Sequence, residues 1–272
     1  MTAYSVLMSV YHKEKPAYFR AAIQSIIDQT VKADEFVIVC DGGLTEELEE
    51  VLTWAKETLK DRIRVVRIPV NGGLGKALNE GLKHVKNELV ARMDTDDVSL
   101  PNRCEMQLRA FSEHPEISVM SGIVEEFSED VSKVNARRVL PGEHEEILEF
   151  AKKRNPFNHP CVMFKKSAVE RAGGYMDMPY LEDYFLWVRM LLNGEKGMNL
   201  QIPLLRMRAG LDMYKRRGGA KYIFSQIRLF SYMRKEGMIT GLQFVKSIAA
   251  RTVSSLIPAK IRHFLFMKLL RK

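Results

Sequence analysis

The stretch Leu89-Val90-Ala91-Arg92-Met93-Asp94-Thr95-Asp96-Asp97-Val98 decides how the rest of the chain is interpreted. Its first half is apolar enough for a buried strand, and its second half places three carboxylates within four residues. So much negative charge at a strand end is costly unless a cation neutralises it. Mg²⁺ and Mn²⁺ prefer carboxylate oxygens and often share them with substrate phosphates. The stretch therefore predicts a metal–nucleotide site at a sheet edge; a solvated strand-to-loop junction is the simpler alternative.

Strand and helix patterns alternate around this stretch. The expected strands are 4–10, 35–40, 63–68, 89–93 and 117–121, and the expected helices are 16–29, 45–59, the segment from the glycine turn to about 86, and 101–114. This rhythm predicts a mostly parallel sheet with helices on both faces. Ligands of such sheets bind beyond the carboxyl ends of the strands, where Asp41, Asn71–Gly75 and Asp94–Asp97 all fall.

The second half of the chain has weaker patterns. Residues 128–155 are polar, with a helix expected at 143–153, followed by a short strand at 161–164 and helices at 167–172 and 181–192. Composition shifts toward Arg, Lys and aromatic residues after Arg206. We therefore expect a first domain at 1–208, divided near residue 121, and a basic helical extension at 209–272.

The net charge of +8 is unevenly distributed. Residues 201–272 carry 16 Lys and Arg against two acids, whereas the first 200 residues carry 26 basic and 32 acidic residues. The C-terminal quarter therefore suits an anionic partner such as phospholipid, lipid-linked phosphate or nucleic acid.

The three cysteines, Cys40, Cys104 and Cys161, are far apart and form no CxxC pair, so neither a zinc site nor a disulfide framework is indicated. This usage suits a reducing cytoplasm. The first residues resemble no signal peptide, and no stretch is long and apolar enough to span a bilayer.

Five motifs, in this order and spacing, resemble those of family 2 glycosyltransferases that build bacterial surface polysaccharides. They are Ser9-Val10-Tyr11, Asp41-Gly42-Gly43, Asn71-Gly72-Gly73-Leu74-Gly75-Lys76-Ala77-Leu78-Asn79, Arg92-Met93-Asp94-Thr95-Asp96-Asp97 and Leu181-Glu182-Asp183-Tyr184. The resemblance extends over roughly residues 4–208. It implies an α/β GT-A fold, a Rossmann-like mixed sheet with flanking helices, here followed by the basic extension.

The resemblance also implies roles in binding a nucleotide-sugar. The nucleotide would be held by Ser9, Tyr11, Asp41, Asn71, Gly72, Lys76, Arg92, Asp94 and Asp96. Asp41 would accept the imide N–H of uracil, although a turn-capping Asp is the alternative. Asp96 and Asp97 would ligate Mn²⁺ or Mg²⁺, which would stabilise the leaving UDP. Lys76 also fits a solvated helix face.

On the acceptor side, the resemblance makes Asp183 the general base of an inverting transfer, with Glu182 orienting the site. The alternative for this pair is acids favoured by a helix N-terminus. His159 would line the acceptor half, 122–208, although a lone His is more often structural. Many such enzymes carry a third metal ligand, a His, beyond the base, and residues 205–210 contain none. Arg206 or Arg208 would then hold diphosphate, or simply be exposed.

Residues 220–235 and 257–272 mix basic and apolar side chains. In 261–272 the two kinds separate onto opposite helix faces, as in a helix lying in a membrane interface. An acceptor linked to polyprenyl diphosphate would suit a protein peripheral to the cytoplasmic face of the plasma membrane. Helices packed back on the catalytic domain are the alternative.

Two rival functions remain. Asp94-Thr95-Asp96-Asp97-Val98 also fits the motif of haloacid-dehalogenase-type phosphatases, in which Asp94 would be the nucleophile, but that motif belongs on a first strand. A non-catalytic basic module binding membrane or nucleic acid would explain the tail alone. We favour a metal-assisted transferase that moves a hexose from a UDP-sugar to a saccharide hydroxyl with inversion, with no nucleic-acid partner.

Overall fold

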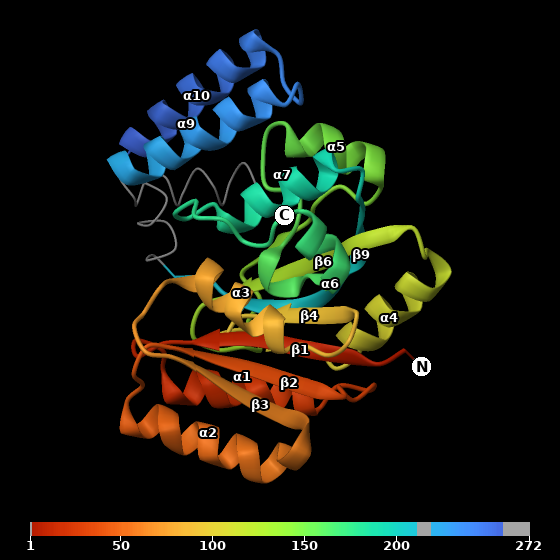
Figure 1. The fold of residues 1–272 in the computed structure, drawn as a ribbon, viewed down its shortest axis with the longest axis vertical. Coiled ribbons are helices and arrows are strands. Elements are labelled where there is room, and N and C mark those ends of the chain that lie inside the picture. The colour runs from red at the N-terminus through yellow and green to blue at the C-terminus, as the bar shows by residue number, and fades with distance from the viewer. Residues whose placement is uncertain (1, 211–218, 258–272) are drawn as a thin grey trace.

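The structure, a computed structural model, describes residues 2–210 and 219–257. Within these residues nine strands form one sheet, in the order β3-β2-β1-β4-β8-β6-β9-β5 with β7 on β6 (Figure 1). The strands are β1 (Tyr4–Val10), β2 (Glu35–Asp41), β3 (Ile63–Ile68), β4 (Leu89–Met93), β5 (Val98–Ser99), β6 (Ile117–Phe127), β7 (Ala136–Arg138), β8 (Met163–Lys165) and β9 (Lys196–Arg208).

The helices lie around this sheet. They are α1 (Pro16–Ile27), α2 (Glu46–Leu59), α3 (Leu74–His84), α4 (Arg103–Glu113), α5 (His144–Ala151), α6 (Lys166–Arg171), α7 (Glu182–Leu192), α9 (Ala220–Lys235) and α10 (Gly241–Leu256), with 3-10 turns η1 (Lys60–Arg62) and η2 (His159–Cys161). The expected alternation of the first half is thus confirmed, within a few residues at helix ends.

The sheet is mixed. β3, β2, β1 and β4 are parallel, whereas β8 pairs antiparallel with both β4 and β6, and β5 pairs antiparallel with β9. The parallel part follows from the three right-handed crossovers expected of βαβ units. The expectation of a mostly parallel sheet therefore holds only for the first half, and the mixed GT-A sheet implied by the resemblance is observed.

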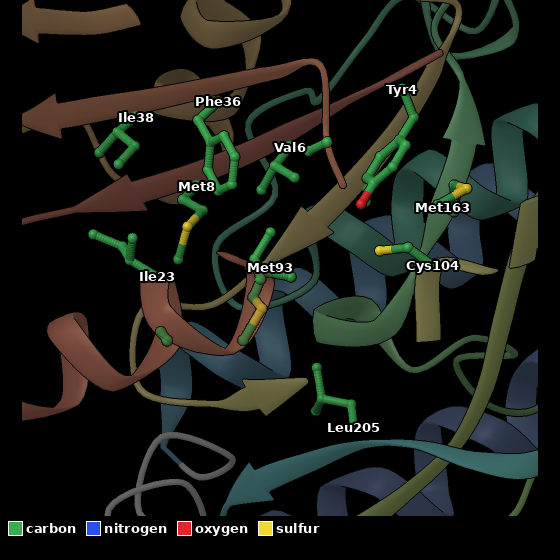
Figure 2. Close-up of a cluster of buried hydrophobic side chains, with 14 of the residues drawn as sticks. Tyr4, Val6, Met8, Ile23, Phe36, Ile38, Met93, Cys104, Met163 and Leu205 are labelled. Atoms are coloured by element: carbon green, nitrogen blue, oxygen red, sulfur yellow. The ribbon is translucent and has the colours of Figure 1, made fainter. Parts of the chain in front are cut away.

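Two apolar layers hold the helices against the sheet. On one face Val6 and Met8 of β1 pack with α1, α2 and α4, and on the other Leu7 packs with α3, α6 and α7. Alternate residues of a strand point to opposite faces, so a strand covered on both sides is apolar throughout. Figure 2 shows the first layer, where Tyr4, Phe36 and Met93 from neighbouring strands lie together.

Sequence reading missed β9. It runs parallel to β6 from Ile117 opposite Lys196 to Phe127 opposite Arg208, with register irregularities near Gly122 and Ile123. Its polar residues and Pro203 break the alternation that identifies a strand. The strand carries the chain back from α7 to the acidic loop after β4, which is how the two halves of the molecule meet.

The C-terminal helices pack on the body of the protein. Leu229, Phe230 and Met233 of α9 are buried against Phe185 and Val188 of α7. α10 packs on α9 and forms the outermost layer in Figure 1. One face of α9 therefore packs on the domain, as the alternative expected, and membrane contact by the C-terminal region stays a prediction. The amphipathic segment 261–272 lies outside the described residues.

Candidate active site

The carboxyl ends of β1, β2 and β4 meet at one edge of the sheet, because these strands are parallel neighbours. Ser9 lies near the end of β1 and is half-buried, and Tyr11, just beyond the strand, is 40% exposed. Asp41 ends β2, and Asp94 follows β4. The structure thus places these four predicted nucleotide-binding residues along a single edge.

Asp41 anchors the glycine turn. It is buried, and its two carboxylate oxygens accept the backbone N–H groups of Gly72 at 2.8 Å and Gly73 at 3.0 Å. The Asn71 side-chain amide donates to the Asp41 carbonyl at 3.1 Å. The turn-capping role foreseen as the alternative is therefore present, and contact between Asp41 and a base stays a prediction.

The turn leads directly into α3. Gly73 has φ of +87°, a conformation that favours glycine, and is the N-cap of the helix. Asn71, Gly72 and Lys76 are exposed. A Cβ on Gly72 would lie 3.1 Å from Cδ of Lys76, so the lysine stem crosses the turn. The N–H groups of Gly72 and Gly73 are bonded to Asp41, so an anionic ligand here would meet the N–H groups of the first turn of α3 and the Lys76 side chain.

Arg92 and Asp94 form an ion pair at the end of β4. The Arg92 guanidinium is 1% exposed and donates to both Asp94 carboxylate oxygens, one of them at 2.8 Å. Two parallel N–H···O bonds fix the orientation of the carboxylate. Arg92 Nε has no hydrogen-bond partner among the described residues. Asp94 is therefore the charge-balanced member of the acidic cluster.

Asp96 and Asp97 form no such ion pair with any residue that the structure describes. Burial, and then the charges of Asp94 and Glu14, raise the pKa of Asp96 to about 7. Burial and the charges of Asp96 and Asp94 also raise the pKa of Asp97 well above its ordinary value. In residues 2–210 and 219–257 no three His, Cys, Asp or Glu side chains lie close enough together to hold a metal. A metal here would need ligands from elsewhere.

Arg208, at the end of β9, closes on the acidic loop. Its backbone N–H donates to Asp97 Oδ1 at 2.8 Å, and its Nε donates to the Asp96 carbonyl at 3.3 Å. Its guanidinium lies 3.6 Å from the ring centre of Tyr18 and 4.5 Å from that of Phe127. Arg206 is half-buried and pairs with Glu125 at 3.3 Å. The expectation of two exposed arginines is therefore wrong, because both pack at the end of β9.

Glu182 and Asp183 begin α7 on the other side of the site. The Asn155 side-chain amide donates to Asp183 Oδ2 at 2.6 Å, and the Tyr184 backbone N–H donates to Oδ1 at 2.7 Å. Burial raises the pKa of Asp183 despite these bonds, and burial with the charge of Asp183 raises the pKa of Glu182 to about 7. Neither acid forms an ion pair with another described residue, although the charges of Arg138 and Arg92 lower the pKa of Asp183.

Helix α3 joins the two sides. A Cβ on Gly75 would lie 3.5 Å from Cβ of Glu182, so the start of α3 contacts the start of α7 closely. One turn further, the Asn79 amide donates to the Tyr175 carbonyl at 2.5 Å and accepts its N–H at 2.8 Å. This two-bond clamp fixes the segment before α7 to the helix that follows the glycine turn.

His159 lies beneath the site and is not exposed to an acceptor. It is 8% exposed, and its Nε2 is 2.9 Å from the Tyr175 hydroxyl. Burial and the charge of Arg92 hold the pKa of His159 well below its ordinary value, so the ring is neutral. Its ring also contacts Trp187, with centres 6.0 Å apart. The position favours the structural role foreseen as the alternative.

Sequence reading missed several residues of this site. Glu14 accepts from the Thr95 hydroxyl at 2.7 Å beside Asp96, and Asn155 and Tyr175 act as described. Arg208 was named as a diphosphate candidate, but its contact with Asp97 was not foreseen. Only Asn79 stood inside a quoted motif. The others come from loops or a strand end without local periodicity, so only the fold brings them to the site.

Comparisons with known proteins agree on one family. Residues 5–173 match the model of glycosyl transferase family 2. The chain is 41% identical to the amylovoran biosynthesis glycosyltransferase AmsE of Erwinia amylovora, covering 97% of this chain and 98% of that one. It is 36% identical to the Escherichia coli UDP-Gal:alpha-D-GlcNAc-diphosphoundecaprenol beta-1,3-galactosyltransferase, covering 99% and 97% of the two chains.

A solved structure shares the fold. The mannosyltransferase PcManGT of Pyrobaculum calidifontis, in complex with GDP-Man and Mn²⁺, aligns with a TM-score of 0.66 at 15% identity, over 98% of this chain and 75% of that one. At that identity the likeness establishes the architecture alone.

Proposed function

Because this chain belongs to glycosyl transferase family 2, we propose that it transfers a hexose from a UDP-sugar to a saccharide hydroxyl with inversion. One observation carries the proposal. The site contains two acidic groups, and among the described residues only the group at the sheet edge includes an arginine ion pair. The first suits a diphosphate with its counter-ion, and the second suits a base.

The acceptor side would work as follows. Asp183 removes the proton from the acceptor hydroxyl, whose oxygen attacks the anomeric carbon as the bond to UDP breaks. Its raised pKa makes it a stronger base than an exposed aspartate, and the bonds from Asn155 and Tyr184 hold it in one orientation. Glu182 lies against the start of α3 and would contact the sugar or the acceptor.

The donor side would hold UDP along the sheet edge. The first-turn N–H groups and Lys76 at the start of α3 would face phosphate oxygens, with Asp41 fixing the turn. Ser9, Tyr11 and Asn71 would line the nucleoside. Arg92 would keep Asp94 oriented toward the ribose. These contacts would place the anomeric carbon between the two acidic groups.

Asp96 and Asp97 fit a divalent cation that takes its other ligands from the diphosphate and water. Mg²⁺ in such sites often uses one or two carboxylates plus substrate phosphates. The raised pKa of both carboxylates reflects negative charge in need of a cation. When bound, Mn²⁺ or Mg²⁺ would offset the charge that develops on UDP. The related fold of PcManGT is described with Mn²⁺.

The acceptor is proposed from the relatives. The Escherichia coli relative is named for transfer to a diphosphoundecaprenol-linked sugar, and AmsE for amylovoran biosynthesis. A lipid-linked saccharide in surface polysaccharide synthesis, at the cytoplasmic face of the plasma membrane, is the matching acceptor here. No helix among the described residues is long and apolar enough to cross a membrane.

The two rival functions are set aside. A phosphatase nucleophile at Asp94 would need a free carboxylate oxygen, and Arg92 engages both. A non-catalytic basic module does not explain why acids from two halves of the chain converge on α3. Family membership points the same way.

The proposal is tested by thermal unfolding of the full chain with UDP, GDP, dTDP or CDP, with and without Mn²⁺. A ligand at about 100 times its dissociation constant should stabilise the protein by about 2.7 kcal/mol. We expect stabilisation by UDP with Mn²⁺, and its loss in Asp97→Asn, which keeps an acceptor for the Arg208 N–H. Asp61→Asn, an exposed change at the opposite sheet edge, is the control.

Stabilisation by UDP that needs no Mn²⁺ would remove the cation from the mechanism and keep the donor site. Stabilisation by another nucleotide instead of UDP would overturn the choice of donor. No stabilisation by any nucleotide would overturn the proposed site.

A further inference from the structure

Within residues 2–210 and 219–257, helix α10 leaves one face without a partner. Leu242, Val245 and Val253 are 65%, 60% and 63% exposed, and Ala249 between them is also exposed. Their spacing of three, four and four residues places all four in one row along the helix. Exposed aliphatic residues are common singly, but a row of them on one helix marks a contact surface. We refer to these four residues as the outer row of α10.

The outer row is not exposed because α10 packs loosely. The opposite face of α10 is already occupied, since Phe244 and Ile248 pack into the α7–α9 cluster and Arg251 stacks on Phe230 at 4.2 Å. The helix also begins at a complete capping box, in which Thr240 and Gln243 exchange hydrogen bonds. The helix is therefore fixed on the body and turns its outer row away from it.

Charge identifies the kind of partner. α9 and α10 contain no acidic residue, and residues 237–272 carry seven Lys and Arg with no Asp or Glu. Lys246 lies one turn after Leu242 and is exposed at the edge of the outer row. Arg234 and Lys235 are exposed where α9 turns into α10. Glu236 is the one acid in the turn between the two helices, and aliphatic side chains with a predominantly basic surround match the interface of an anionic bilayer.

We propose that the outer row of α10 inserts into the headgroup region of an anionic phospholipid membrane, with Lys246 and the basic turn at the phosphate level. The helix would lie on the surface, because it is too short and polar to cross. α10 is the outermost layer of the molecule, with α9 between it and α7, so the membrane would approach without disturbing the sheet (Figure 1). This contact does not depend on the proposed sugar transfer.

The test is flotation of the full chain with vesicles of phosphatidylglycerol and phosphatidylcholine, or of phosphatidylcholine alone, in the absence of any substrate. We expect binding to the anionic vesicles. Val245→Asp/Val253→Asp should lower the partition coefficient at least tenfold, because each buried valine is worth roughly tenfold in partition. Val134→Asp, an equally apolar exposed position on the loop between β6 and β7, should bind as the wild type does.

Charge is tested separately with Lys246→Gln, which should weaken binding to anionic vesicles about fivefold and leave binding to phosphatidylcholine unchanged. Equal binding of the wild type and the valine variant would overturn the proposal, as would no binding by either. A concentration-dependent dimer that the valine variant abolishes would show that the outer row contacts a second copy, and would also overturn it. Nucleotide-induced stabilisation of the valine variant shows independently that the donor site is intact.

Discussion

The two acidic regions of the site balance their charge in different ways. At the sheet edge, Asp94 is paired with the buried Arg92, and Asp97 accepts the backbone N–H of Arg208. At the start of α7, Asp183 is held by an amide and a backbone N–H and forms no ion pair with the other described residues. Burial raises the pKa of carboxylates in both regions. This difference in partners, more than the residue type, is why we propose a phosphate site at the sheet edge and a base at the start of α7.

The sharpest test of this difference is Asp183→Asn. Removing the base should lower kcat by about 10²- to 10⁴-fold and leave UDP-induced thermal stabilisation unchanged. UDP release in the presence of donor and acceptor measures the first effect. Glu182→Gln, the neighbouring carboxylate-to-amide change, should cost much less. Full activity in Asp183→Asn with loss in Glu182→Gln would reverse the two roles.

Next in size is the effect of Asp94→Asn on stability. It leaves the Arg92 guanidinium buried without its counter-charge, which should cost about 3 kcal/mol of unfolding free energy in urea. Adding Arg92→Met should restore part of this loss, because the double variant buries no charge. Glu49→Gln breaks the exposed pair with Arg67 and should cost less than about 1 kcal/mol. Equal costs for the two single variants would mean that burial of Arg92 is unimportant.

A smaller effect is expected from Asn155→Ala. The Asn155 hydrogen bond lowers the pKa of Asp183, so its loss should raise that pKa further. The base must be deprotonated, and the acidic limb of the kcat/KM profile should therefore move to higher pH. Asn193→Ala at the end of α7 is the control, since its amide bonds only to the Arg171 carbonyl. If the acidic limb of the kcat/KM profile does not shift in Asn155→Ala, Asn155 does not influence the pKa of the base.

The smallest effect concerns stability and pH. The pKa of Glu182 is about 7 in the folded chain against an ordinary 4.5, so the folded state binds more protons than the unfolded state between these values. Unfolding free energy should therefore fall as pH rises from 4.5 to 7. Urea midpoints across this range should fall less in Glu182→Gln. An identical slope in the variant would show that Glu182 does not contribute.

The sequence was sufficient for the parallel half of the sheet. β1, β3 and β4 have the expected bounds, and β2 ends one residue later than expected. β1, β2 and β4 are mostly apolar because they are buried on both faces, whereas β3 is a half-buried edge strand. The helices between them show a 3.6-residue pattern and carry recognisable starts, such as Pro16 or the Thr45 cap. The acidic motifs predicted residues that lie on both sides of the candidate site.

The residues that hydrogen-bond to those motifs could not be predicted from the sequence. Asn155 is 28 residues from Asp183, and Arg208 is 111 residues from Asp97. No local pattern encodes such pairs, and that of Arg208 with Asp97 results from how β9 is placed beside β6 and β5. The wrong expectation for Arg206 and Arg208 has the same origin, because a basic residue at an unrecognised strand end reads as a surface residue.

Strand β9 has a consequence for the order in which the protein matures. The acidic loop leaves the ribosome more than a hundred residues before Arg208, the backbone donor to Asp97, has been made. A nascent chain of 173 residues, which ends where the match to the family model ends, already contains β1 to β4 but lacks both Asp183 and β9. Chains of this kind acquire long-range contacts last. The acidic loop is therefore joined to Arg208 only after Glu182 and Asp183 have been synthesised, so an unfinished chain lacks the complete site that we propose.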